Sequence, residues 1–321
     1  MTETLPKSSS DDFVFWTPPE GMTLSIGADE HLDLPNISLP ICAADAPDDL
    51  GVAPSERLIG EGIYAYLCVY PETGHAPVYA DILRQAYPFL ISDIGSQLLL
   101  LDLRPYDAVA LQKKIPLLKI LLLLDENNFG LLHKLGVAFY HLALHPDYLI
   151  VAGEQLKCAR QWLEKARRIS PQDVNNLNYL GQVCYLSGNY HQAKLYWQNV
   201  VNQLGNEKEQ TQLQHRLDLI SQGGVPLQAL QHQLEQMGQA HKLFAVGDVA
   251  PAYELVERLV VQGELLQELP NAEFYHLIGL CREAVNDLAG AYEAFTMATQ
   301  LDDKHEQARN ALKRVSPVTW N

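Results

Sequence analysis

The spacing of small residues in the second half of the chain constrains its fold more than any other feature of the sequence. In two helical-looking stretches a glycine is followed, twelve residues later, by an alanine: Gly181 by Ala193, and Gly279 by Ala291. A residue with little or no side chain lets one helix approach another closely, and a bulky residue such as Trp197 fills the space beyond that crossing. The spacing therefore predicts helical hairpins with small residues where the two helices cross.

A tight turn is expected between the two helices of each hairpin. In the first stretch Gly188 and Asn189 take this position, because glycine adopts a left-handed backbone easily, and Tyr190 is expected to pack across the turn. A weaker copy keeps Gly247 at its turn but has Ala240 in place of the crossing glycine.

A further copy, earlier in the chain, is interrupted. Gly136 and Ala159 lie 23 residues apart, so this copy carries an insertion of eleven residues around residues 146–156. An extra helix-like segment, "KEQTQLQHRLDLI", separates two later copies. Both features predict an irregular stack of hairpins.

These copies resemble tetratricopeptide repeats, whose 34-residue pattern runs from W-x₂-L-G-x₂-Y through A to F, A and P. The best copy is residues 174–207, and the copy at 272–305 is followed by a plausible capping helix, "HEQARNALKRV". The matches in the best copy are Leu180, Gly181, Gly188, Tyr190, Ala193 and Trp197. The resemblance covers residues 129–315 and implies a right-handed α-solenoid.

The rest of the chain lacks this pattern. Residues 54–128 have helical periodicity, so we expect a divergent helical region there, and degenerate repeats are one interpretation of it. Residues 1–53 hold ten acidic side chains, one lysine and six prolines, which predicts a flexible, extended acidic arm with two apolar islands, "FVFW" and "ISLPIC". Residues 316–321 form a tail. Because no convincing run of alternating β-branched residues occurs, the chain is predicted to be all-α.

Composition narrows the class of protein. A net charge of −16 argues against nucleic acid and anionic membrane surfaces as partners. The apolar runs are too short or too interrupted to span a bilayer, so no membrane insertion is expected. The first residues lack the pattern of a secretory signal, and five scattered cysteines are typical of reduced thiols. We therefore expect a cytoplasmic protein.

The resemblance also implies where a partner binds. In this family the first helix of each hairpin lines a concave groove that binds an extended peptide or a helix. Carrying the groove positions over gives the candidate residues His133, Tyr140, His141, Asn178, Gln182, Tyr185 and His276. These positions hold no lysine or arginine, so a clamp for a terminal carboxylate is not expected. The alternative interpretation is a set of solvated groove side chains.

Motifs for catalysis or cofactor binding are absent from the sequence, so no catalytic, cofactor-binding or metal residue is assigned. His141 and His145 have the i, i+4 spacing of a chelating pair, but Pro146 ends the helix, and a chain with eleven histidines contains such pairs by chance.

Three functions remain open at this point. The leading hypothesis is a non-catalytic scaffold or adaptor that binds a peptide or helix of a protein partner. A cytoplasmic chaperone of a bacterial secretion system is the alternative, because the short type III chaperones are also built from tetratricopeptide repeats. A metal-binding protein or an enzyme is the alternative of another class. Self-association through exposed repeat ends is also compatible with the sequence.

Overall fold

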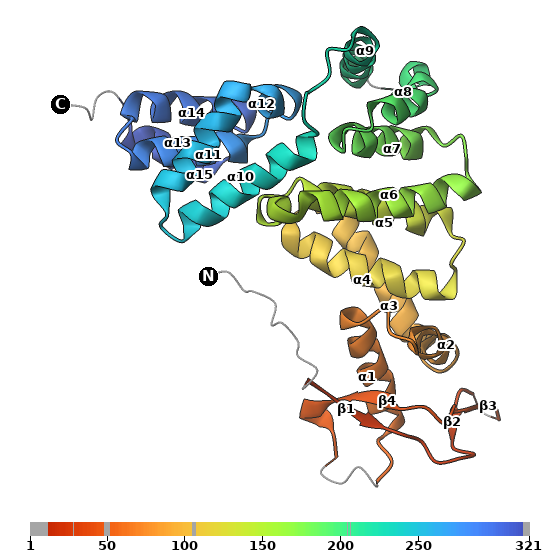
Figure 1. Ribbon diagram of the computed structural model, residues 1–321. Helices are drawn as coiled ribbons and strands as arrows, with labels where there is room; N and C mark the ends of the chain where they lie inside the picture. Colours follow the sequence, from red (N-terminus) through yellow and green to blue (C-terminus); the bar gives the residue numbers. More distant parts are fainter. Residues whose placement is uncertain are drawn as a thin grey trace. The chain divides into compact units, whose positions relative to one another are not determined.

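The computed structural model describes residues 12–27, 29–47, 52–104, 107–203, 205 and 207–316 (Figure 1). The first eleven residues of the predicted arm, and residues 317–321 of the tail, lie outside the described residues. The chain divides into two compact units, Met1–Leu135 and Gly136–Asn321, and the division falls within helix α5 (Phe129–Ala143).

Part of the segment predicted to be an extended arm forms strands. The strand β1 (Phe13–Trp16) pairs antiparallel with β4 (Leu39–Cys42), and β2 (Thr23–Ser25) pairs antiparallel with β3 (His31–Asp33). The first apolar island of this segment is therefore β1, and the second contains β4. The all-α prediction is wrong for these residues, because strands of three or four residues are too short to show a period of two in the sequence.

The β1–β4 pair is part of the core of the first unit. It packs on α1 (Glu56–Val69), where a Cβ atom added at Gly62 would lie 2.8 Å from the Cα of Ile41. On the neighbouring strand, the ring of Phe13 meets the ring of Tyr66 edge to face at 5.1 Å. The apolar islands thus dock on a helix while the acidic residues between them remain exposed.

The remaining helices of the first unit pack on one another. They are α2 (Ala76–Ala86), α3 (Pro88–Asp102), α4 (Ala108–Leu124) and the first part of α5, with the short helix η2 (Ala43–Asp45) before α1. The carboxylate of Asp102 accepts hydrogen bonds from the buried Lys114 and from Lys134, which joins α3, α4 and α5. Lys114 and Lys134 are therefore both paired with one carboxylate of the same unit.

The second unit is helical throughout its described residues. In chain order its elements after α5 are η3 (Pro146–Val151), α6 (Ala152–Ile169), α7 (Val174–Leu186), α8 (Tyr190–Gln198), η4 (Val201–Gln203), α9 (Glu207–Gln222), α10 (Leu230–Ala245), α11 (Val249–Gln262), α12 (Glu264–Glu268), α13 (Ala272–Ala284), α14 (Leu288–Leu301) and α15 (Glu306–Arg314). Figure 1 shows α7 beside α8, and α13 beside α14, as antiparallel hairpins.

The close approach of two helices that was predicted at each glycine is confirmed, but the nearest residue there is a bulky one and not the alanine of the pattern. A Cβ atom added at each glycine would lie 2.5 Å from a carbon of one bulky side chain, much closer than the 3.5–4.0 Å at which carbon atoms pack. The pairs are Gly136 with Leu163, Gly181 with Trp197, and Gly279 with Phe295. The two residues of each of the last two pairs are sixteen positions apart, and those of the first pair are 27 positions apart. The difference between the two separations equals the predicted eleven-residue insertion.

The turns of three hairpins share one backbone conformation. Gly188, Gly247 and Asn286 have φ of 76°, 91° and 66°, and each lies seven residues after its crossing position. The predicted packing of Tyr190 across the turn is also present, with its ring 5.3 Å from that of Tyr185. Local spacing thus specifies both the crossing and the turn.

The insertion forms a contact that the repeat pattern does not contain. It folds as η3, which packs on α10. A Cβ atom added at Gly238 of α10 would lie 2.7 Å from the backbone carbonyl carbon of Leu149. Ala240, which takes the glycine's place in this copy, is buried in the same core as Val256 of α11. Helix α10 therefore has two close-approach positions, one for its hairpin partner and one for η3.

Candidate functional site

The seven predicted groove residues lie on the first helices of three hairpins, as the resemblance implies. His133, Tyr140 and His141 are on α5, and His276 is on α13. Asn178, Gln182 and Tyr185 are on α7. Several of these side chains bond to or pack against other residues of the protein. Only some of the seven lie close to one another.

On α7, two of the predicted residues take part in a polar network with other helices of the second unit. Arg216 of α9 donates from Nη1 to Oε1 of Gln182 at 2.6 Å and from Nε to Oε2 of Glu268 at 3.0 Å. Tyr185 donates its hydroxyl proton to Oε1 of Glu268 at 3.0 Å, and the Arg216 guanidinium lies 5.1 Å from the centre of its ring. Helices α9 and α12 therefore already occupy this part of the α7 face.

The network is buried, which makes it a structural feature. The side chains of Arg216 and Glu268 are only 14% and 12% exposed, and Tyr185 is fully buried. Burial, followed by the nearby Glu268 carboxylate, raises the pKa of Tyr185 far above its usual range, so the hydroxyl remains a donor. The segment "KEQTQLQHRLDLI" predicted the extra helix, but nothing in it indicated that its Arg216 contacts α7.

A second group of predicted residues is aromatic. Within the second unit, the ring of Tyr140 lies 5.3 Å from the rings of His141 and of Tyr179 on α7. Tyr140 is buried, and burial raises its pKa. The Oδ1 of Asn178 is also buried and has no hydrogen-bond partner among the described residues. In the first unit, the ring of His133 stacks on that of Phe129.

A hollow that the sequence did not reveal lies along α10, the first helix of the weaker copy. Its volume is about 1010 Å³. Its lining residues recur at intervals of three and four along the helix, and Ile150 of η3 adds to them: Ile150, Gln228, Ala229, His232, Glu235, Gln236, Gln239, Lys242, Leu243 and Val246. Oε1 of Glu235 accepts from the backbone N–H of Gly153 at 3.1 Å, which fixes one wall of the hollow to α6.

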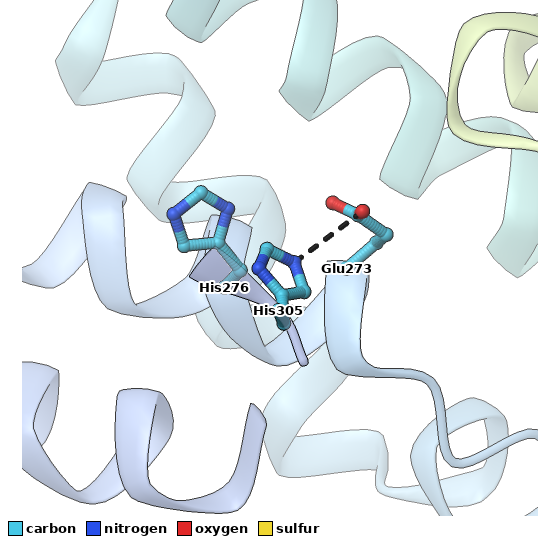
Figure 2. Close-up of side chains that lie close together, drawn as sticks. All are labelled: Glu273, His276 and His305. Carbon is cyan, nitrogen blue, oxygen red and sulfur yellow. Dashed lines mark ion pairs between the residues drawn. The ribbon is translucent and has the colours of Figure 1, made fainter. Parts of the chain in front are cut away.

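A cluster of three side chains near the end of the second unit was also missed, apart from its one predicted member, His276. Glu273 and His276 lie on α13, and His305 is the N-cap residue of α15 (Figure 2). The Nε2 atom of His305 lies 3.3 Å from Oε1 of Glu273, and the two imidazole rings are 4.9 Å apart. The separation of 29 residues between His276 and His305 explains why no motif search finds the cluster.

In the described ranges no single helix is both long and apolar enough to cross a bilayer. The helix α5 and residues 146–169 together have the required length and composition, but they form a pair that is bent by 100°.

Comparisons with known proteins do not identify a family for this chain. No family model matches the chain, and no curated protein matches it. Among solved structures it is similar to a tetratricopeptide repeat protein from Parabacteroides merdae, at 15% identity and a TM-score of 0.29, over 81% of this chain and 91% of that one. The hairpins themselves carry the conclusion, because their crossings and turns recur in register. The chain is a helical repeat protein.

Proposed function

We propose that this protein is a non-catalytic scaffold or adaptor that binds an extended segment of a protein partner in the hollow along α10. The observation that carries the proposal is the hollow itself, about 1010 Å³ in volume, on the first helix of a hairpin. This is the helix that lines the binding groove in tetratricopeptide repeat proteins, although none of the seven residues predicted from the motif lines this hollow.

The chemistry of the hollow suits a peptide backbone. Gln228, Gln236 and Gln239 present amide groups that both donate and accept hydrogen bonds, as a peptide unit requires. Leu243 and Val246 add apolar surface for the partner's side chains. The helical part of the hollow's lining, Leu230–Ala245, is about 23 Å long at 1.5 Å per residue, which accommodates about seven residues of extended chain.

The α7 face is a weaker candidate for the same task. A peptide that bound Gln182 or Tyr185 would have to displace Arg216, which is bonded to Glu268. Breaking a buried ion pair costs about 3–5 kcal/mol when one partner is left unpaired. Binding along α10 requires no such rearrangement, because His232, Gln239 and Lys242 are already exposed.

A cytoplasmic location is part of the proposal. Cys42, Cys68, Cys184 and Cys281 are free thiols, and the last two are buried in the helical core. Isolated thiols of this kind are typical of a reducing compartment.

The test is an affinity purification from cells that express the full-length protein, with two matched variants. Gln239→Trp fills the hollow with an indole, whereas Gln300→Trp makes the same change at an exposed position of α14. We expect mass spectrometry to find a partner with the wild type and with Gln300→Trp, and to find it depleted at least tenfold with Gln239→Trp. Equal recovery with both variants would contradict the site.

The size of the recovered complex separates two kinds of partner binding. A multi-protein assembly on size-exclusion chromatography is expected for a scaffold or adaptor. A single small client bound at equal stoichiometry would instead favour the chaperone role, which the same hollow permits.

A further inference from the structure

We propose that Glu273, His276 and His305 bind one divalent transition-metal ion of the Zn²⁺ class. Two imidazole nitrogens and one carboxylate oxygen are the donor set of many three-ligand zinc sites. One ligand atom from each residue lies within 4.8 Å of the other two. This site is separate from the peptide-binding hollow, since none of the three residues lines that hollow.

The local fold brings the three side chains to one point. Glu273 and His276 are three residues apart on α13, so they share one face of the helix. The N-terminus of α15 places His305 beside them (Figure 2). Two ligands at about 2.1 Å from a tetrahedral ion are about 3.4 Å apart. The observed 3.3 Å between Nε2 of His305 and Oε1 of Glu273 matches that distance, and a side-chain rotation of His276 completes the set.

A buried nitrogen supplies independent support. The His305 side chain is only 7% exposed, and its Nε2 atom has no hydrogen-bond partner among the described residues, since its approach to Glu273 lacks hydrogen-bond geometry. Leaving a buried polar atom unsatisfied is costly, and a metal ion would satisfy Nε2 once its proton had moved to Nδ1.

Access and an open coordination position come from a small cavity. Glu273 and His276 line a cavity of about 140 Å³, whose other walls include His241 and Gln307. This volume exceeds the roughly 30 Å³ that a water molecule takes up in the liquid. The cavity is therefore large enough to hold a metal-bound water beside Glu273 and His276.

Metal binding would also change the start of α15. Nδ1 of His305 accepts a hydrogen bond from the backbone N–H of Ala308 at 3.2 Å, so in this state the proton of the neutral imidazole is on Nε2. When Nε2 binds the metal, the proton moves to Nδ1 and the capping bond breaks. Occupancy of the site thus alters the N-terminus of the last helix.

The experiment uses full-length protein treated with a chelator and then titrated with Co²⁺, a spectroscopic probe for zinc sites. We expect one Co²⁺ per chain, visible absorption of a tetrahedral site, and displacement by Zn²⁺. His305→Asn keeps a side-chain oxygen able to cap α15 but removes Nε2, and it should weaken binding at least tenfold. The matched control His215→Asn, on the exposed face of α9, should bind as the wild type does.

Two results would overturn the proposal: wild-type protein without saturable binding of one Co²⁺, or His305→Asn with wild-type affinity. If His305→Asn fails to fold by circular dichroism, Glu273→Gln gives the decision, because this side chain is 48% exposed and its exchange leaves the core intact. Unchanged Co²⁺ affinity in Glu273→Gln would then contradict the site.

Discussion

The hairpins α7–α8 and α10–α11 fill the same crossing in different ways. The first pairs a glycine with the largest side chain, Gly181 with Trp197. The second has Ala240 and Val256 sixteen residues apart in the corresponding positions, both fully buried. As one residue grows by a methyl group, the other shrinks from an indole to an isopropyl group. Glycine is therefore paired at these crossings with side chains that range from leucine to tryptophan, and alanine with the smaller valine.

The largest effect on stability should come from removing the indole at the crossing of α7 and α8. Trp197→Ala removes a fully buried indole, and we expect the free energy of unfolding to fall by about 3–5 kcal/mol. Val256→Ala removes two methyl groups and should cost about 2 kcal/mol. Urea denaturation followed by circular dichroism measures both. Equal losses in the two variants would show that the crossings are not filled by these side chains.

The next effect should come from overfilling a glycine crossing. Gly279→Ala places a methyl group against the ring of Phe295, and we expect a loss of about 1–3 kcal/mol in thermal or urea unfolding. The control is Gly95→Ala in α3, where a Cβ atom meets no other described atom within 4 Å. That change should stabilise the protein by about 0.5–1 kcal/mol through helix propensity. A stabilised Gly279→Ala would contradict the close approach.

The hydrogen bond between Tyr196 of α8 and Glu164 of α6 should contribute to stability in a way that depends on pH. Burial alone would raise the pKa of Glu164, but hydrogen bonds from Tyr196 and Arg167 outweigh it, and the pKa lies below its usual value. Because the folded pKa is lowered, this stabilisation is complete above the unfolded value of about 4.3 and is lost as the pH falls through the folded pKa.

The corresponding variant is Glu164→Gln. We expect it to be less stable than the wild type by about 1 kcal/mol at pH 7, and the difference should shrink at pH values below about 4. Urea unfolding across this pH range measures the effect. A difference that stays constant down to pH 3 would rule out a role for the Glu164 charge.

The smallest effect concerns the turns. Asn286 has the positive φ that glycine adopts without strain, so Asn286→Gly should change stability by no more than about 0.5 kcal/mol. The reverse exchange, Gly188→Asn, should cost about 1 kcal/mol, because a Cβ atom there would lie 3.0 Å from the Cβ of Ala229. Differential scanning calorimetry resolves both shifts, and a more stable Gly188→Asn would contradict this difference between the turns.

The sequence predicted what depends on local spacing. The crossings at Gly136, Gly181 and Gly279 and the turn at Gly188 follow from residues less than thirty positions apart. The mostly helical class was correct except for the short strands β1 to β4. The right-handed winding and the predicted domain ranges stay predictions.

Contacts between distant segments could not be predicted. Arg216 meets Gln182 and Glu268 across 34 and 52 residues, and no repeat position encodes that meeting. The candidate site followed the same rule. The motif placed Gln182 and Tyr185 on α7 but gave no sign that α9 packs against that helix. The hollow along α10 is lined in part by Ile150 of η3, a segment that belongs to no repeat.

The contact between Leu149 and Gly238 has a consequence for how the chain acquires its structure. The two residues are about 90 positions apart, so during synthesis Leu149 emerges from the ribosome long before the helix that covers it. In an ordinary repeat array each unit touches only its neighbours, and order can spread from one unit to the next. Here η3 keeps part of its apolar surface uncovered until α10 is present, so we expect residues 136–245 to become stable together and not one hairpin at a time.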